Sequence, residues 1–147
     1  MTLYCTLENI ELQIGKATLI QLSNDDSSQE TIDTVVCDEA ILYSSTLIDG
    51  YLRGKYPLPL NSQFPLLRVI AIDLSIYRLY SRRIYTEIPE TISAAYKNAI
   101  KTLEDLKKGI ITLQTEEETN VQSSGEYRTN KTESDRIFNN RVMNFEY

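Results

Sequence analysis

The sequence predicts an all-α fold, a helical bundle packed around a central buried helix at residues 65–83. That stretch, PLLRVIAIDLSIYRLYSRR, is apolar on nearly every side, which is typical of a helix in the middle of a core. Arg68, Asp73 and Arg78 interrupt the apolar run. It is therefore no membrane span, because roughly 20 uninterrupted apolar residues are needed to cross a bilayer. Apolar residues also recur every three or four positions in residues 30–53 and 90–108, which predicts two more long helices.

The N-terminal part predicts two short helical pieces. Thr6 can cap a helix whose partly apolar face includes Leu7 and Ile10, and Gly15 should end it. Residues 16–22 then make one or two further turns. The polar run SNDDSSQ at 23–29 is interpreted as a solvated loop.

The middle of the chain predicts a long helix, a stiff connector and the central helix. The long helix covers residues 30–53 and should end at Gly54. The connector KYPLPL at 55–60 is expected to be extended, since each proline disfavours the α conformation of the residue before it. Pro65 suits the first position of the central helix, where its missing N–H costs nothing.

The third long helix is expected at residues 90–108. Its acidic start and its final Lys107 and Lys108 agree with the helix dipole, and Gly109 suits the position just after the end. The following IITL at 110–113 has the composition of a short β-like piece. These elements together predict a helical domain over residues 1–113.

The C-terminal part divides into two segments of different composition. Residues 114–136 are polar and acidic and should form a flexible linker, because they cannot bury enough apolar surface to order themselves. Residues 137–147 are apolar and aromatic again, which favours an extended docking arm able to form a short strand. The alternative is that this arm folds back on its own core. The side chains expected to dock are Ile137, Phe138, Arg141, Val142, Met143, Phe145 and Tyr147.

Composition limits the possible functions. The 147 residues carry a formal net charge of −6, which argues against a protein that binds DNA by neutralising its phosphates. There is no histidine, and the two cysteines, Cys5 and Cys37, are interpreted as reduced core residues. No secretory signal is recognisable at the N-terminus, and no motif indicates a cofactor. We therefore expect a cytoplasmic protein, or a component of an assembly formed in the cytoplasm.

Charges inside otherwise apolar helices are the candidate polar sites. Asp49 and Arg53 are spaced to pair on their own helix, whereas Asp73 is five residues from both Arg68 and Arg78 and should reach to neighbouring helices. We interpret all five as structural ion pairs that fix helix register, with a catalytic site and a contact between subunits as alternatives.

Two further sets of side chains have simpler interpretations. The acidic loop with Asp25, Asp26 and Asp33 lacks the glycine and bidentate glutamate of a calcium loop, so we expect no metal there. The tyrosines form either an interface or the edge of the core with their hydroxyls in water. They include Tyr43, Tyr51, Tyr56, Tyr77, Tyr80 and Tyr85.

The run STLIDGYLRGKYPLPL at residues 45–60 is the most specific motif of the sequence. Together with other segments it resembles a family of Mu-like phage and prophage neck proteins, the head–tail connectors or adaptors. The other segments are 65–68, 73–80, 96–106, Gly109 and 135–145. The loop at 24–33 departs from the family, where a more calcium-like, glycine-containing run is common.

The resemblance implies a structural virion protein and no enzyme. Such proteins form a ring, typically a dodecamer, below the portal protein at the head–tail junction. The ring extends the DNA channel, which DNA passes without specific binding, and docks the tail or tail-terminator proteins. Two alternatives remain from the residues alone: a helical regulatory or interaction domain in the host cytoplasm, and a metal-dependent enzyme using Asp49 and Asp73.

Overall fold

The computed structural model describes residues 2–26, 28–60, 64–83, 85 and 87–113. They lie within residues 1–115, which form one compact unit. The expected linker at 114–136 and arm at 137–147 lie outside the described residues. These described residues form five helices: α1 (Leu7–Ile14), α2 (Lys16–Ser23), α3 (Thr34–Leu52), α4 (Pro65–Ser81) and α5 (Glu90–Lys108). The predicted all-α fold is confirmed.

Local sequence signals account for the ends of the first two helices. The Thr6 hydroxyl accepts the Asn9 N–H at 3.4 Å, and the Asn9 side-chain oxygen accepts the Thr6 N–H at 3.1 Å. This reciprocal pair caps α1. Gly15 has φ 81° and both ends α1 and begins α2. A left-handed φ favours glycine, so the break between the two helices is specified by this residue.

Helix α3 begins at Thr34, four residues later than the pattern indicated. The Asp33 carboxylate accepts the N–H groups of Val35 and Val36 at 3.0 and 3.3 Å, so Asp33 is the N-terminal cap. The helix ends at Leu52, and Gly54 follows with φ 98°. The expected start at Glu30 was wrong because the capping aspartate, and not the apolar period, fixes the first turn.

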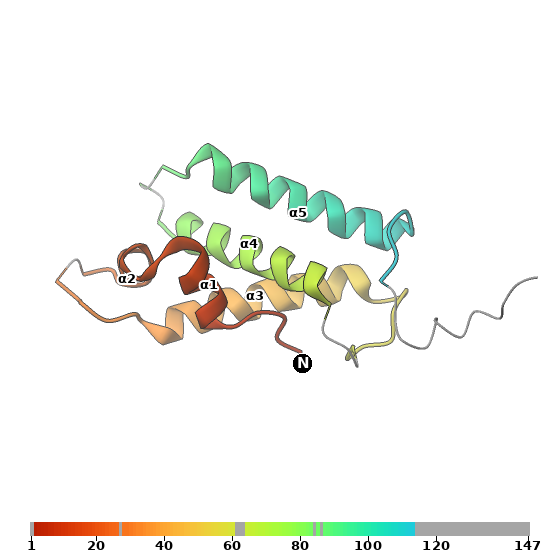
Figure 1. Cartoon of the computed structure of the whole chain (residues 1–147), viewed down its shortest axis with the longest axis horizontal. Coiled ribbons are helices and arrows are strands. Elements are labelled where there is room, and N and C mark those ends of the chain that lie inside the picture. The colour runs from red at the N-terminus through yellow and green to blue at the C-terminus, as the bar shows by residue number, and fades with distance from the viewer. Residues whose placement is uncertain (1, 27, 61–63, 84, 86, 114–147) are drawn as a thin grey trace, which may run out of the picture. The chain divides into compact units, whose positions relative to one another are not determined.

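Helices α3, α4 and α5 pack on one another, and α1 and α2 lie against both α3 and α4. In Figure 1, α4 runs between α3 and α5, and α1 and α2 lie over one end of the layer. Because α3 and α4 each contact every other helix, they share the central place that was predicted for residues 65–83 alone. Helix α4 also turns an apolar edge outward, with Leu66 at 39% and Val69 at 55% exposure.

The segment after α5 closes the helix and forms no strand, so the expected β-like piece at 110–113 was wrong. Gly109 has φ 84°, and the Ile110 and Ile111 N–H groups return to the Asp105 carbonyl at 2.9 and 3.3 Å. Leu113 is buried, and its N–H donates to the Tyr56 hydroxyl at 3.0 Å. The described residues contain no neighbouring strand with which the segment could pair.

Small polar side chains fix the contact between α3 and α4. The buried Ser75 hydroxyl lies 2.9 Å from the Ser44 hydroxyl, 2.7 Å from the Ala71 carbonyl and 3.8 Å from the Cys5 sulfur. Serines at this crossing let two helix backbones approach closely while their hydroxyls stay hydrogen-bonded. Cys5 and Cys37 are free and buried, as the sequence indicated.

Candidate functional site

One face of α3 is exposed over the whole length of the helix. We call it the outer stripe and define it by residues that recur at helical spacing and are exposed: Val35, Asp38, Glu39, Leu42, Thr46, Gly50 and Arg53. Val35 is 67% and Leu42 47% exposed, although both are apolar. The opposite face of α3 is buried against the core, so the stripe is the side that the described residues leave uncovered.

Two hollows flank the second half of the outer stripe and share Thr46 and Gly50. The larger has a volume of about 680 Å³ and is lined by Thr2, Thr46, Asp49, Gly50, Arg53, Tyr56, Leu58 and Pro59. The smaller, of about 420 Å³, is lined by Tyr43, Thr46, Leu47, Gly50, Tyr51 and Lys107. Apolar walls with a few charged groups are typical of surfaces that receive another molecule.

Gly50 sits between the two hollows, inside a long helix. Glycine in a helix interior costs about 1 kcal/mol of stability relative to alanine. A Cβ added at Gly50 would meet no atom within 4 Å, so packing inside the described chain does not require this glycine. Because Gly50 has no side chain, the backbone of α3 is accessible to another molecule at this position.

Asp49 is held by a tyrosine from the N-terminal segment. The Tyr4 hydroxyl donates to the Asp49 carboxylate at 2.5 Å, and the Tyr4 N–H donates to the Ser45 hydroxyl at 3.4 Å. Burial raises the pKa of Tyr4, and the hydrogen bond and negative charge of Asp49 raise it further. The carboxylate that the sequence offered as an ion-pair partner or catalytic group therefore fastens residues 4 and 49 together.

Of the other predicted charges, Arg53, Arg68 and Arg78 are exposed and Asp73 is half-buried. The ion pairs between described residues join Arg82 to Asp25 at 2.5 Å and Lys108 to Glu104 at 3.5 Å. The Arg78 guanidinium lies 4.9 Å from the centre of the Tyr43 ring. Asp73 is half-buried on α4, and its burial raises the pKa of the carboxyl above the usual range.

Several tyrosines from α3, α4 and α5 lie near one another, and two of them, Tyr43 and Tyr51, line the smaller hollow. The Tyr77 and Tyr96 rings stack at 4.0 Å, and the Lys107 ammonium lies 6.0 Å from the Tyr51 ring centre. Burial raises the pKa of Tyr96, and the nearby Tyr43 hydroxyl adds to the shift. The residues thus lie at the edge of the core, with cations placed over two of their rings.

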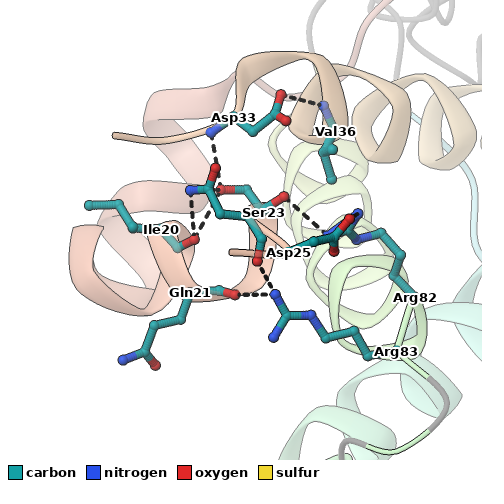
Figure 2. A network of polar contacts seen from close by, with 9 residues as sticks. Ile20, Gln21, Ser23, Asp25, Asp33, Val36, Arg82 and Arg83 are labelled. Atoms are coloured by element: carbon teal, nitrogen blue, oxygen red, sulfur yellow. Dashed lines mark hydrogen bonds and ion pairs between the residues drawn. The ribbon is translucent and has the colours of Figure 1, made fainter. Parts of the chain in front are cut away.

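A second polar cluster joins the end of α4 to the end of α2. Figure 2 shows the Arg82 and Arg83 side chains reaching the turn after α2. Arg83 donates to the carbonyls of Gln21, at 2.8 Å, and Asn24, while Arg82 donates to the Ser23 carbonyl at 3.1 Å and pairs with Asp25. Carbonyls at the end of a helix carry the negative end of its dipole, so two guanidinium groups suit this position.

The acidic loop uses its carboxylates within the fold. Asp25 pairs with Arg82, Asp26 accepts the Ser28 N–H at 2.9 Å, and Asp33 caps α3. In the part of the chain that the structure describes, no three acidic or sulfur side chains gather in a way that could hold a metal ion. Nor is any described helix long and apolar enough to cross a membrane.

Sequence reasoning identified Asp49 and Arg53 but missed the arginine cluster and the stripe. The two adjacent arginines, Arg82 and Arg83, could be recognised in the sequence. Their hydrogen-bond acceptors could not, because these are mainly backbone carbonyls, which every residue carries. Gly50 was also visible as a glycine inside a helical pattern. The seven predicted docking residues at 137–147 lie outside the described part of the chain.

Comparisons with known proteins agree with the motifs of the sequence. A family model described as "Bacteriophage Mu, Gp36" matches residues 4–131, which is most of the chain. "Gene product J" of Escherichia phage Mu is 24% identical over 106 residues, which cover 72% of this chain and 72% of that protein. The matched region contains all five helices and the outer stripe.

Proposed function

This chain belongs to the bacteriophage Mu Gp36 family, and we propose that it is a structural virion protein of the phage neck. In this role it is a head–tail connector subunit that forms a ring, a dodecamer, below the portal protein. The ring extends the DNA channel and docks the tail or its terminator. Before assembly the protein is in the host cytoplasm, and afterwards at the head–tail junction of the virion.

The family match over residues 4–131 is the observation that carries this proposal. The match includes the specific IDGYL and YPLPL run of α3 and its connector, so it reaches the region in which the outer stripe and both hollows lie. Packing within the described chain does not require a glycine at position 50. An exposed glycine beside apolar side chains is consistent with a surface that another protein contacts.

Charge distribution also supports passage of DNA without binding. The net charge is −6, and Lys16 is the one basic residue before Arg53. DNA phosphates are repelled by acidic walls, so a channel lined by the N-terminal half would let DNA slide. The carboxylates available for such a wall include Glu8, Glu11, Asp38 and Glu39.

The aromatic composition of residues 137–147 supports a docking role for the C-terminal segment. Large apolar side chains, among them Phe138, Val142 and Phe145, follow a polar run that has few apolar residues. In the proposed mechanism this arm joins the portal by filling an apolar groove or adding a strand. The proposed role is the association of this protein with the portal, and it involves no catalytic step and no cofactor.

Light scattering after size exclusion, with and without the cognate portal, tests the role. We expect a species that joins the portal as a ring of many copies. The full chain should be compared with a chain lacking 137–147 and with a matched control, Asn139→Ser/Asn140→Ser, that keeps the apolar side chains of the arm. The shortened chain should lose portal binding, while the control should bind like the full chain.

The result can also favour the alternatives. A stable small oligomer that ignores the portal, absent from purified virions, would support a host-cytoplasmic interaction domain instead. A nuclease activity that depends on magnesium or manganese and is lost in Asp49→Asn would support the enzyme alternative. Either outcome would overturn the neck role.

A further inference from the structure

The outer stripe of α3 is complementary to itself when a second copy is turned end over end. Its first half exposes apolar and acidic side chains, Val35, Asp38, Glu39 and Leu42. Its second half exposes the open backbone at Gly50 and the cation of Arg53, with a hollow on either side. An interface that repeats around a two-fold axis requires such a patch, because each half must fit the other half of the partner.

The spacing along the stripe sets one register. If the two-fold axis passes beside Thr46, each residue before it faces the residue equally far after it on the second copy. Leu42, four positions before Thr46, then faces Gly50, four positions after it. Glu39 faces Arg53 in the same way, seven positions on either side. Both contacts occur twice in the pair.

The two facing pairs are complementary, one in shape and the other in charge. A Cβ at Gly50 would meet nothing within 4 Å, and the hollows on both sides share Gly50, so the 47%-exposed Leu42 side chain has space to enter. Arg53 forms no ion pair with any described residue, and neither does Glu39. Opposite charges at the rim would steer the two copies into this register.

We propose that the free protein associates as a two-fold pair in which α3 packs antiparallel against α3 of a second copy, centred on Thr46, with Leu42 over Gly50 and Glu39 against Arg53. This pair goes beyond the proposed neck role and does not rest on it. Because a single helix pair buries a small area, the association should be weak and reversible, so it is measured at concentrations of about 10–500 µM.

Charge variants of the full chain test the register. Glu39→Arg and Arg53→Glu should each weaken self-association about tenfold or more, since each brings like charges together twice. An equimolar mixture of the two variants should restore a pair, because each contact then joins opposite charges. Sedimentation should give the mass of two chains, about twice 16.9 kDa. Unchanged association of the single variants, or no recovery in the mixture, would overturn the proposal.

A cross-link tests the position of the axis. Thr46→Cys should give a covalent dimer on mild oxidation with copper–phenanthroline and air, which joins two thiols as one disulfide, because the two Cys side chains meet at the axis. Ala94→Cys, exposed on α5, is the matched control and should stay monomeric. Cys5 and Cys37 are buried and should not contribute. Equal cross-linking of both variants would overturn the register.

Substitutions at Gly50 test the packing of the two helices without changing any charge. Gly50→Leu should reduce self-association about tenfold or more, because its side chain occupies the space that Leu42 of the second copy needs. Gly50→Ala should associate nearly as well as the natural chain. Circular dichroism of both variants should show the helical content of the natural chain, and a Gly50→Leu protein that associates normally would contradict the proposal.

Discussion

Arg53 and Arg82 occupy the same position, the cap that follows a long helix, and are used in opposite ways. Arg82, with Arg83 beside it, binds carbonyls at the end of α2 and the Asp25 carboxylate. Arg53 is exposed and borders the larger hollow, and its side chain forms no hydrogen bond with the described residues. One end of the bundle uses its arginines to hold the chain together, and the other presents its arginine to the outside.

The difference between Arg53 and the Arg82–Arg83 pair indicates which surface is available to bind another molecule. Most polar groups of the arginine cluster, the buried Arg82 Nε excepted, are already hydrogen-bonded inside the chain. Such groups gain little from a partner, since a new contact must replace an existing one. Exposed groups beside open backbone have no such competitor. The outer stripe is therefore the better candidate surface.

The largest expected effect is at the arginine cluster. Arg83→Ala should lower the free energy of unfolding by about 2 kcal/mol, because it leaves the Gln21 and Asn24 carbonyls without their charged donor. Urea denaturation followed by circular dichroism measures it. Arg53→Ala is the control and should stay within about 0.5 kcal/mol of the natural chain. Equal losses in both variants would remove the distinction between the two ends.

A smaller effect is expected where the N-terminal segment meets α3. Tyr4→Phe removes the hydroxyl that donates to Asp49 and should destabilise the protein by about 1 kcal/mol, since the site is partly exposed. The same denaturation experiment measures it, and Tyr85→Phe, at a 99% exposed position, should have no effect. If Tyr4→Phe were as stable as the natural chain, Asp49 would not be fastening the segment.

A substitution at Gly50 should raise the free energy of unfolding, whereas the two substitutions above lower it. Gly50→Ala should stabilise the free protein by about 0.5–1 kcal/mol, because alanine favours helix and its Cβ meets no atom within 4 Å. Thermal unfolding at low protein concentration avoids any contribution from self-association. Gly54→Ala is a useful contrast, since its φ of 98° predicts a loss of stability. A destabilised Gly50→Ala protein would mean that the glycine serves the fold itself.

The smallest effect depends on pH. Burial raises the pKa of Asp73 above the ordinary 3.8 in the folded state, so the folded chain binds this proton more tightly than the unfolded chain. The contribution of Asp73 to stability is therefore favourable at low pH and is lost as pH rises through the raised pKa. Asp73→Asn should be more stable than the natural chain at neutral pH, by less than about 1 kcal/mol, and the gain should shrink at about pH 3.5. Denaturation at the two pH values measures it, and an equal difference at both would contradict it.

Signals carried by neighbouring residues could be recognised in the sequence, and those carried by distant residues could not. Thr6, Gly15 and Gly109 mark helix ends through their own backbone and side-chain chemistry, and the structure uses all three in this way. The spacing of Asp49 and Arg53 allowed a pair on their own helix, and it left a partner across the core open. The partner of Asp49 is Tyr4, 45 positions away, which becomes a neighbour only after the N-terminal segment packs on α3.

Thr2 lines the larger hollow beside Asp49, and this position has a practical consequence for handling the protein. Any residues fused ahead of Thr2 begin at the edge of the outer stripe. An affinity tag placed there would lie beside Gly50 and Arg53 and could shield them from other molecules. Binding experiments therefore call for a tag that is cleaved before measurement, with the uncleaved protein serving as an internal probe of whether this face is used.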